Sequence, residues 1–191
     1  MEAKRFNTVS DLLNLPESSR AELIDGKIVE KALPGGEHAK VEGAIAFEIS
    51  KYFRKKSRDD GTGGWWILPE VTIYYPALDR ALVADIAGWR RERIPEIPKG
   101  YPVRERPDWI CEVSHTTWKK DTTTVFETLL AEGVPYYWVV DVERKNLLVY
   151  ELIEKKYALI QSLFLDSGRV KIKPFDTVEL NVSVLLGEAE E

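Results

Sequence analysis

The sequence has little cysteine and no long apolar run, and both features narrow its class. A single cysteine occurs in 191 residues, so no intramolecular disulfide can form, which fits a reducing compartment. This residue, Cys111, lies in the apolar run 109–113, where we expect a buried structural thiol. The N-terminus lacks an apolar leader, and no run is long enough to span a bilayer. We therefore predict a cytoplasmic protein with no membrane partner.

Positive charge is also in short supply. The chain has 27 Lys and Arg against 32 Asp and Glu, a net charge of −5. This balance argues against a protein that coats nucleic acid non-specifically, because such proteins are usually basic. It leaves a nuclease open, since a metal site concentrates acids and needs only local basic patches. The length and the 44% hydrophobic content predict a single domain over 1–187, followed by a disordered acidic tail at 188–191.

The pattern of apolar residues predicts an α/β protein. Helical periodicity marks 4–15, 38–57 and 118–131, and Asp25-Gly26 predicts the turn of a hairpin over 21–31. Short β-branched and aromatic runs predict the remaining strands at 65–68, 71–75, 82–88, 109–113, 135–141, 147–152, 157–163 and 169–172. The last three of these suggest an antiparallel β extension.

Two acidic residues lie inside strands that are otherwise apolar. Asp85 is in Leu-Val-Ala-Asp-Ile-Ala-Gly (82–88), and Glu112 is in Trp-Ile-Cys-Glu-Val (109–113). Burying a carboxylate is costly unless it is compensated. One compensation is Mg²⁺, which binds one or two carboxylates and fills its other positions with water or phosphate. The alternative is a pair of structural acids in salt bridges, and the spacing alone does not decide between the two.

Several stretches together resemble the Uma2 (DUF820) family. They are Glu-Leu-Ile-Asp-Gly (22–26), Pro-Gly-Gly-Glu-His (34–38), Val-Ala-Asp-Ile-Ala-Gly-Trp-Arg (83–90), Arg-Pro-Asp-Trp-Ile-Cys-Glu-Val-Ser (106–114) and Glu-Gly-Val-Pro-Tyr-Tyr-Trp-Val-Val-Asp (132–141). The family is classed with the PD-(D/E)XK nucleases. The resemblance implies a restriction-endonuclease-like core, with a mixed β-sheet flanked by helices.

The resemblance also implies a metal site. The ion, Mg²⁺ or Mn²⁺, would be held by Asp85, Glu112 and the backbone carbonyl of Val113. Glu22 and His38 would stand near it as further residues of the active site. Without the resemblance, Glu22 reads as an exposed strand acid and His38 as a capping or surface histidine.

The chain departs from the family pattern at three positions. Ala84 stands where the family usually has proline. Ser114 replaces the superfamily's lysine two residues after the glutamate, and the lysine that the family takes from the next helix falls on Val125. We expect Lys119 or Lys120 to supply the missing catalytic charge, because helical side chains point toward the N-terminus of their helix.

A cluster of arginines follows the Asp85 strand. Arg90, Arg91 and Arg93 are candidates for nucleic-acid contacts, because guanidinium groups bind phosphate well. The alternative is a solvated loop in which they pair with Glu92 and Glu96.

The sequence thus predicts a metal-dependent endonuclease that hydrolyses phosphodiester bonds of nucleic acid, with DNA the expected substrate and a homodimer the expected assembly. A second reading is a catalytically inactive family member that binds nucleic acid or protein. Ser114 and Val125 motivate that reading. A third is a purely structural homo-oligomer.

Overall fold

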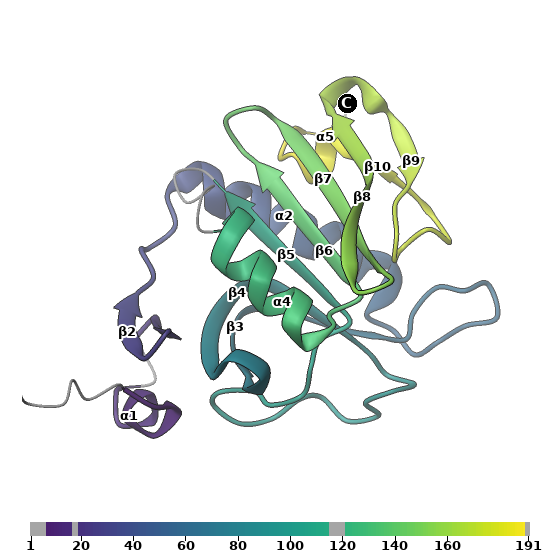
Figure 1. Cartoon of the computed structure of the whole chain (residues 1–191). Helices are drawn as coiled ribbons and strands as arrows, with labels where there is room; N and C mark the ends of the chain where they lie inside the picture. Colours follow the sequence, from purple (N-terminus) through teal and green to yellow (C-terminus); the bar gives the residue numbers. More distant parts are fainter. Residues whose placement is uncertain (1–6, 17–18, 115–120, 190–191) are drawn as a thin grey trace, which may run out of the picture.

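The chain alternates short helices and strands in its first half and is mostly strands in its second half (Figure 1). The computed structural model describes residues 7–16, 19–114 and 121–189. The first half contains α1 (Val9–Leu13), β1 (Ala21–Ile24), β2 (Lys27–Glu30), α2 (Gly36–Phe53), β3 (Trp65–Tyr75), η1 (Pro76–Leu78), β4 (Arg80–Arg90) and β5 (Trp109–Ser114). The second half contains η2 (Asp121–Val125), α4 (Phe126–Glu132), β6 (Tyr136–Asp141), β7 (Asn146–Ile153), β8 (Lys156–Phe164), η3 (Leu165–Ser167), β9 (Arg169–Lys171), β10 (Glu179–Asn181) and α5 (Val182–Leu185).

One mixed sheet organises the described part of the chain. Its order is β2-β1-β4-β5-β6-β7-β8, and β3 pairs with β4 along the other edge of that strand. Strands β5 and β6 are parallel, as a helical connection between them requires, whereas the other neighbours are antiparallel. The predicted mixed sheet flanked by helices is confirmed. Of the predicted antiparallel extension, β7 and β8 continue the sheet beyond β6, whereas β9 pairs with β10 in a separate two-stranded sheet.

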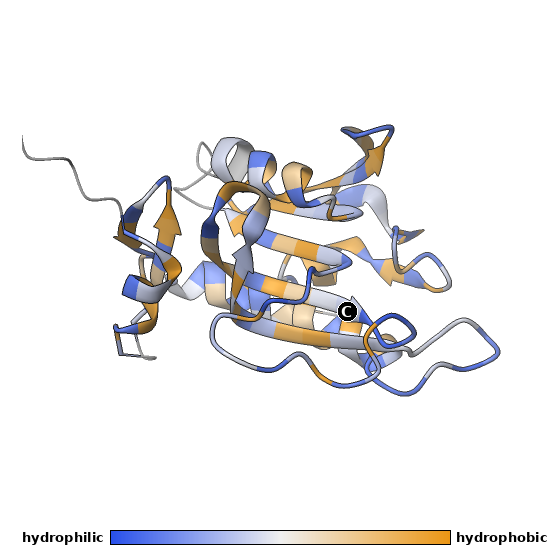
Figure 2. Ribbon diagram, turned by 60° about the horizontal axis from the view of Figure 1, so that its bottom comes forward, coloured by the Kyte–Doolittle hydropathy of each residue, from blue (hydrophilic) through white to orange (hydrophobic). Residues whose placement is uncertain are grey.

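Helices cover both faces of the sheet. Helix α2 packs its apolar stripe, which includes Val41, Ile45 and Ile49, on one face, and α4 packs Leu129 on the other. Figure 1 shows α4 in front of the strands and α2 behind them, and Figure 2 shows the apolar stretches of the central strands between these layers. We call the apolar cluster under α2 the α2-side core and the apolar cluster under α4 the α4-side core.

In the described ranges, no helix combines the length and apolar character that crossing a membrane needs.

The hairpin before α2 forms as its sequence predicts. Asp25 and Gly26 both have positive φ, 51° and 70°, and β1 pairs with β2 on either side of them. Two positive φ values match the twist of a two-residue hairpin, which explains why Asp-Gly occupies the turn. The turn is also tied to the sheet, because Arg80 Nη2 of β4 donates to Asp25 Oδ1 at 2.7 Å.

Several boundaries differ from the predictions, and the helix predicted over 38–57, for example, spans Gly36–Phe53. The runs 65–68 and 71–75 form one continuous strand, β3, with Glu70 at a positive φ of 50° between them. Residues 118–120 of the predicted helix 118–131 lie outside the described residues. The described part begins with a π-helical turn, Asp121–Val125. Of the predicted acidic tail, Glu188 accepts a hydrogen bond at Oε1 from Lys145 Nζ at 2.6 Å, and its backbone N–H donates to Ser183 O.

Candidate metal and phosphate site

The candidate site lies where two strands diverge from β4. On this edge, β1 pairs with β4 only at Leu23–Ala81, whereas β5 pairs with it from Ile86 onward. Residues 82–85 therefore have no partner strand on this edge within the described structure. Backbone groups left open in this way must find other partners. We call this opening the fork.

Charged side chains fill the fork in place of a strand. Glu22 Oε1 accepts a hydrogen bond from the backbone N–H of Val83 at 3.2 Å. The backbone carbonyl oxygen of Val83 accepts a hydrogen bond from Lys31 Nζ at 2.7 Å. Glu22 is therefore buried with a structural contact to β4, close to the carboxylates that were predicted beside it. Its predicted position near Asp85 follows from the hairpin, because β1 brings it to the fork.

Asp85 reaches the fork through a kink in its strand. Ala84 and Ala87 both pack in the α4-side core, although strict alternation would place residues three apart on opposite faces. Opposite this point on β3, Glu70 has the positive φ noted above. The kink is where Asp85 lies, with 1% of its surface exposed.

Glu112 and Val113 meet Asp85 because of strand register. Cys111 pairs with Ile86, so the next residue of β5 lies beside the preceding residue of β4. The backbone N–H of Val113 donates to Asp85 Oδ2 at 2.7 Å, which fixes one carboxylate oxygen. Glu112 is also buried, 4% exposed, and both residues line the same pocket as Asp85. The predicted juxtaposition of the two carboxylates is thus present.

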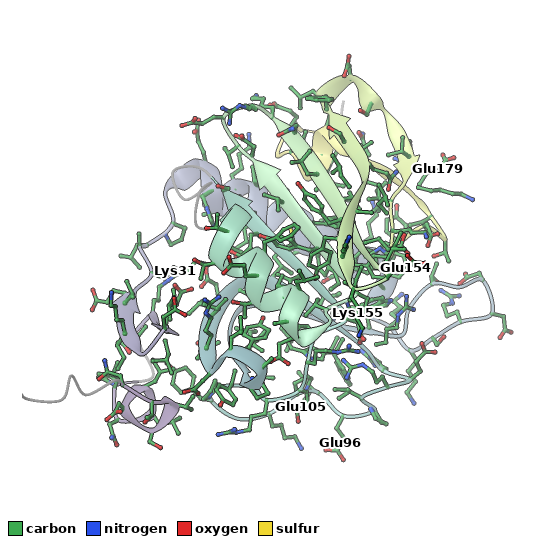
Figure 3. The ribbon with its side chains drawn as sticks, viewed as in Figure 1. Lys31, Glu96, Glu105, Glu154, Lys155 and Glu179 are labelled. Carbon is green, nitrogen blue, oxygen red and sulfur yellow. The ribbon has the colours of Figure 1, made fainter. Side chains whose placement is uncertain are left out.

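Lys31 is a site residue that the sequence analysis missed. Its ammonium lies 2.7 Å from Asp85 Oδ1 and 3.4 Å from Glu112 Oε2, in addition to its bond with Val83 O. Figure 3 shows Lys31 between the β1–β2 hairpin and the sheet. No local pattern marks this lysine, because its partners are 52 to 81 residues away in the sequence.

His38 lies on the other side of Asp85, near the start of α2. Its Nε2 is 3.5 Å from Asp85 Oδ2 and 3.6 Å from Glu42 Oε2. This nitrogen is buried and makes no close hydrogen bond within the described structure. The predicted placement of His38 beside the carboxylates agrees with this geometry. Glu42, one helical turn later on the same face, is a further neighbour that the sequence analysis did not single out.

The charged groups at the fork shift one another's pKa values. Burial would lower the pKa of Lys31, but the carboxylates of Glu112 and Asp85 outweigh it and raise that pKa. Burial would raise the pKa of Asp85, but His38 and Lys31 hold it well below its usual range. The Asp85 carboxylate likewise raises the pKa of His38. Asp85 is therefore an ionised carboxylate at neutral pH, as a metal ligand must be.

Glu42 behaves differently, because burial and the nearby Asp85 charge raise its pKa to about 7. Between its ordinary pKa of 4.5 and this value, the folded protein keeps a proton that the unfolded chain loses. The contribution of Glu42 to the free energy of unfolding is therefore complete below about pH 4.5 and is lost as the pH rises through 7. We expect Glu42→Gln to reduce the fall in unfolding free energy between pH 5 and 8 by about 1–2 kcal/mol, given partial solvent screening.

Urea unfolding in EDTA at four pH values measures this difference. Glu37→Gln, an exposed change on the same helix, is the matched control and should keep the wild-type pH dependence. An unchanged pH dependence in Glu42→Gln would contradict the assignment.

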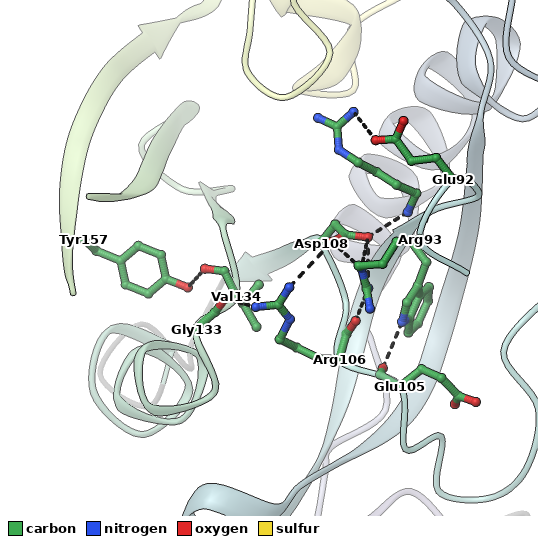
Figure 4. A network of polar contacts seen from close by, with 10 residues as sticks. Glu92, Arg93, Glu105, Arg106, Asp108, Gly133, Val134 and Tyr157 are labelled. Atoms are coloured by element: carbon green, nitrogen blue, oxygen red, sulfur yellow. Dashed lines mark hydrogen bonds and ion pairs between the residues drawn. The ribbon is translucent and has the colours of Figure 1, made fainter. Parts of the chain in front are cut away.

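The three arginines at the end of β4 and just beyond it do not line the pocket over the fork. Arg93 binds Asp108, with its Nε 2.8 Å from Asp108 Oδ1, and Figure 4 shows this pair within a network that includes Arg106. The guanidinium carbon Cζ of Arg91 lies 3.6 Å from the ring centroid of Trp66, and that of Arg90 lies 4.5 Å from the ring centroid of Trp65. Of the alternative pairings with Glu92 and Glu96, the described residues show Arg90 with Glu92 at 4.0 Å, whereas Glu96 pairs with Lys99 at 2.9 Å. Their role in nucleic-acid contact stays a prediction.

The position where the family pattern places a lysine lies in apolar packing. Val125 is buried in the α4-side core with Leu129 and does not line the pocket. Lys119 and Lys120 lie outside the described residues. Ser114 is 1% exposed at the end of β5.

A pocket of about 320 Å³ opens over the fork. Two cations and a histidine share its wall with the acids, and Arg20, like Lys31, was not singled out in the sequence. Arg20 also forms an ion pair with Glu70 at 3.0 Å. The lining residues are Arg20, Lys31, Ala32, Leu33, Pro34, Gly35, Gly36, Glu37, His38, Asp85, Glu112 and Val113.

The donor set suits a hard divalent cation that keeps part of its water shell. The described residues contain no cluster of three or more His, Cys, Asp or Glu side chains arranged to hold a metal. That excludes an all-side-chain cage within these ranges, such as structural zinc prefers. Mg²⁺-type ions need fewer protein ligands, because water and substrate phosphate complete the shell. Asp85, Glu112 and the pocket-lining Val113 meet this smaller requirement, with His38 Nε2 close by.

Comparisons with known proteins agree with this fold. The profile of the Uma2 family, described as "putative restriction endonuclease", matches residues 9–183. A crystal structure of a "putative nuclease belonging to DUF820" from Anabaena variabilis is similar in fold, with a TM-score of 0.71 and 20% identity over 94% of this chain and 97% of that one. A search of proteins with curated functions found no match. Because the profile covers most of its length, the chain belongs to the Uma2 family.

Proposed function

We propose that this protein is a nuclease that uses a divalent cation, Mg²⁺ or Mn²⁺, to hydrolyse phosphodiester bonds of nucleic acid, with DNA the expected substrate. The observation that carries the proposal is the pair of buried carboxylates, Asp85 and Glu112, at a fork in the sheet beneath an open pocket. Membership in a family of restriction-endonuclease-like proteins, which generally use divalent metals, supports the same chemistry.

Each residue at the fork has a definite task in this proposal. Asp85 and Glu112 would hold the ion, and the carbonyl of Val113 would complete the protein ligands. When bound, such an ion polarises the phosphate and lowers the pKa of a water molecule. Arg20 on the pocket wall faces the phosphate charge, because guanidinium binds phosphate oxygens strongly. His38 lies beside Asp85, whose carboxylate raises the pKa of the imidazole, so a protonated His38 balances charge when the substrate is absent.

The reaction itself is a hydrolysis that needs no other reactant. The oxygen of a water molecule forms a bond to phosphorus, and the bond from phosphorus to one ester oxygen breaks. The water gives up a proton to solvent, and the leaving oxygen takes one, so the products are a phosphate monoester and a hydroxyl. Positioning and electrostatic stabilisation supply most of the rate in such displacements.

Cleavage of a panel of substrates by the wild-type protein tests the proposal. Plasmid, linear duplex, single-stranded DNA and RNA are incubated with Mg²⁺, with Mn²⁺ and with EDTA, and products are resolved on gels. We expect cleavage with metal and none with EDTA. Asp85→Ala protein prepared in parallel controls for a contaminating nuclease. No cleavage of any substrate by folded wild-type protein would overturn the proposal and favour a binding role.

A further inference from the structure

A lysine is absent from both positions where the family pattern places one. Ser114 occupies the strand position, and Val125 packs in the α4-side core. The fork nevertheless contains an ammonium group. Resting on the proposed function, we infer that Lys31, delivered by the end of the β1–β2 hairpin, is the lysine of this active site.

The backbone holds Lys31 firmly in this position. Its N–H donates to the carbonyl oxygen of Arg20 at 2.7 Å, which extends the pairing of β1 and β2 by one step. The far end of the same hairpin is anchored to β4 by Arg80 and Asp25. With the hairpin fixed at both ends, the side chain enters the fork with 13% of its surface exposed.

Its contacts distinguish Lys31 from an ordinary counter-ion. One ammonium meets Asp85 Oδ1, Glu112 Oε2 and Val83 O, and it also lines the open pocket. It therefore touches both proposed metal ligands and faces the space that a phosphate would enter. A single positive charge between two carboxylates also leaves negative charge for a divalent cation to neutralise.

The chemistry expected of Lys31 follows from this placement. In the hydrolysis, negative charge builds on the phosphate oxygens as the water oxygen attacks phosphorus. A fixed ammonium at the pocket wall stabilises that charge and orients the attacking water by donating a hydrogen bond. Stabilisation by pre-positioned donors is commonly worth 10² to 10³ in rate (roughly, from single-donor removals).

Lys31→Met is the direct test, with Lys27→Met as its matched control. Lys27 is an exposed lysine of the same hairpin, so both variants lose one positive charge. We expect Lys31→Met to lower kcat by about 100-fold or more, with duplex binding in Ca²⁺ little changed. Lys27→Met should cleave like the wild type. Equal cleavage by Lys31→Met and the wild type would overturn the inference.

A chemical rescue separates the ammonium from a structural role. Lys31→Cys, treated with 2-bromoethylamine, regains an ammonium on a side chain of lysine's length. We expect treatment to restore cleavage at least tenfold in this variant and to leave the wild type, whose Cys111 is buried, unchanged. Absence of rescue in a folded, fully alkylated protein would mean that the ammonium does not act in the reaction.

Mn²⁺ affinity, measured by calorimetry without substrate, gives a readout independent of cleavage. Since Lys31 shares both carboxylates with the ion, removing its charge should tighten Mn²⁺ binding by about tenfold or more. Lys27→Met should bind as the wild type does. If the wild type cleaves nothing but this shift appears, the proposed nuclease fails while the placement of Lys31 at the cation site stands. Unchanged affinity in Lys31→Met would overturn that placement.

Discussion

Replacing Asp85 by alanine should abolish metal-dependent cleavage, lowering kcat/KM by about 1000-fold or more. Asp85 lies at the centre of the site. One of its carboxylate oxygens contacts Lys31, and the other accepts from the Val113 N–H and lies 3.5 Å from His38 Nε2. The change removes half of the carboxylate pair. It also leaves Lys31 with one carboxylate fewer in a buried setting, so we expect a loss of stability of about 3 kcal/mol as well.

Stabilisation by metal separates the loss of the site from the loss of stability. Mn²⁺ should raise the melting temperature of the wild type, because a ligand that binds only the folded state stabilises it. The same addition should leave Asp85→Ala unchanged. Asp59→Ala, an exposed aspartate in the loop after α2, is the matched control and should keep both cleavage and the metal response. Wild-type cleavage by Asp85→Ala would move the reaction to another site or to a contaminant.

The fork shows how far a sequence can predict a site. Asp85 and Glu112 could be found because each is an acid inside an apolar strand, and burial makes such residues conspicuous. Their pairing follows from the register of adjacent strands. Lys31 could not be found in this way, since a lysine after a short exposed strand looks like any solvated residue. Its role depends on which strands diverge from β4, which is a property of the tertiary topology.

The position of Val125 follows from regular helical phasing. Val125 directly precedes α4 and has α-helical backbone angles, and Leu129 follows it by four residues. Residues four apart lie on the same face of a helix, so both side chains pack in the α4-side core. The family pattern places a lysine at this position, but the packing that surrounds it is decided by the tertiary fold.

The arginines illustrate a different limit. From the sequence, Arg93 is a candidate either for phosphate or for pairing with Glu92 and Glu96. Its partner is Asp108, which reaches it only because the loop between β4 and β5 returns to the sheet, with the Asp108 N–H donating to Gly88 O at 2.8 Å. Composition predicts that arginines bind anions, but the fold decides which anion.

Replacing Phe175 by alanine should strongly destabilise the fold, with a loss of about 3–5 kcal/mol in unfolding free energy. Phe175 is fully buried, and its ring centroid lies 4.8 Å from that of Phe53, 4.9 Å from Trp109 and 5.0 Å from Trp65. It comes from the segment between β9 and β10, whereas its partners come from α2, β5 and β3. One ring therefore joins the C-terminal segment to the layer that supports the fork.

Urea unfolding monitored by tryptophan fluorescence measures this loss. Phe47→Ala, on the same core-forming helix as Phe53 but 69% exposed, is the matched control and should change stability by less than about 0.5 kcal/mol. Because a domain typically has only about 5–15 kcal/mol of stability, the Phe175 variant should also melt at a markedly lower temperature. A loss below about 1 kcal/mol with an unchanged urea dependence would mean that the C-terminal segment does not pack on the α2-side core. The helix that carries His38 would then owe its position to the sheet alone.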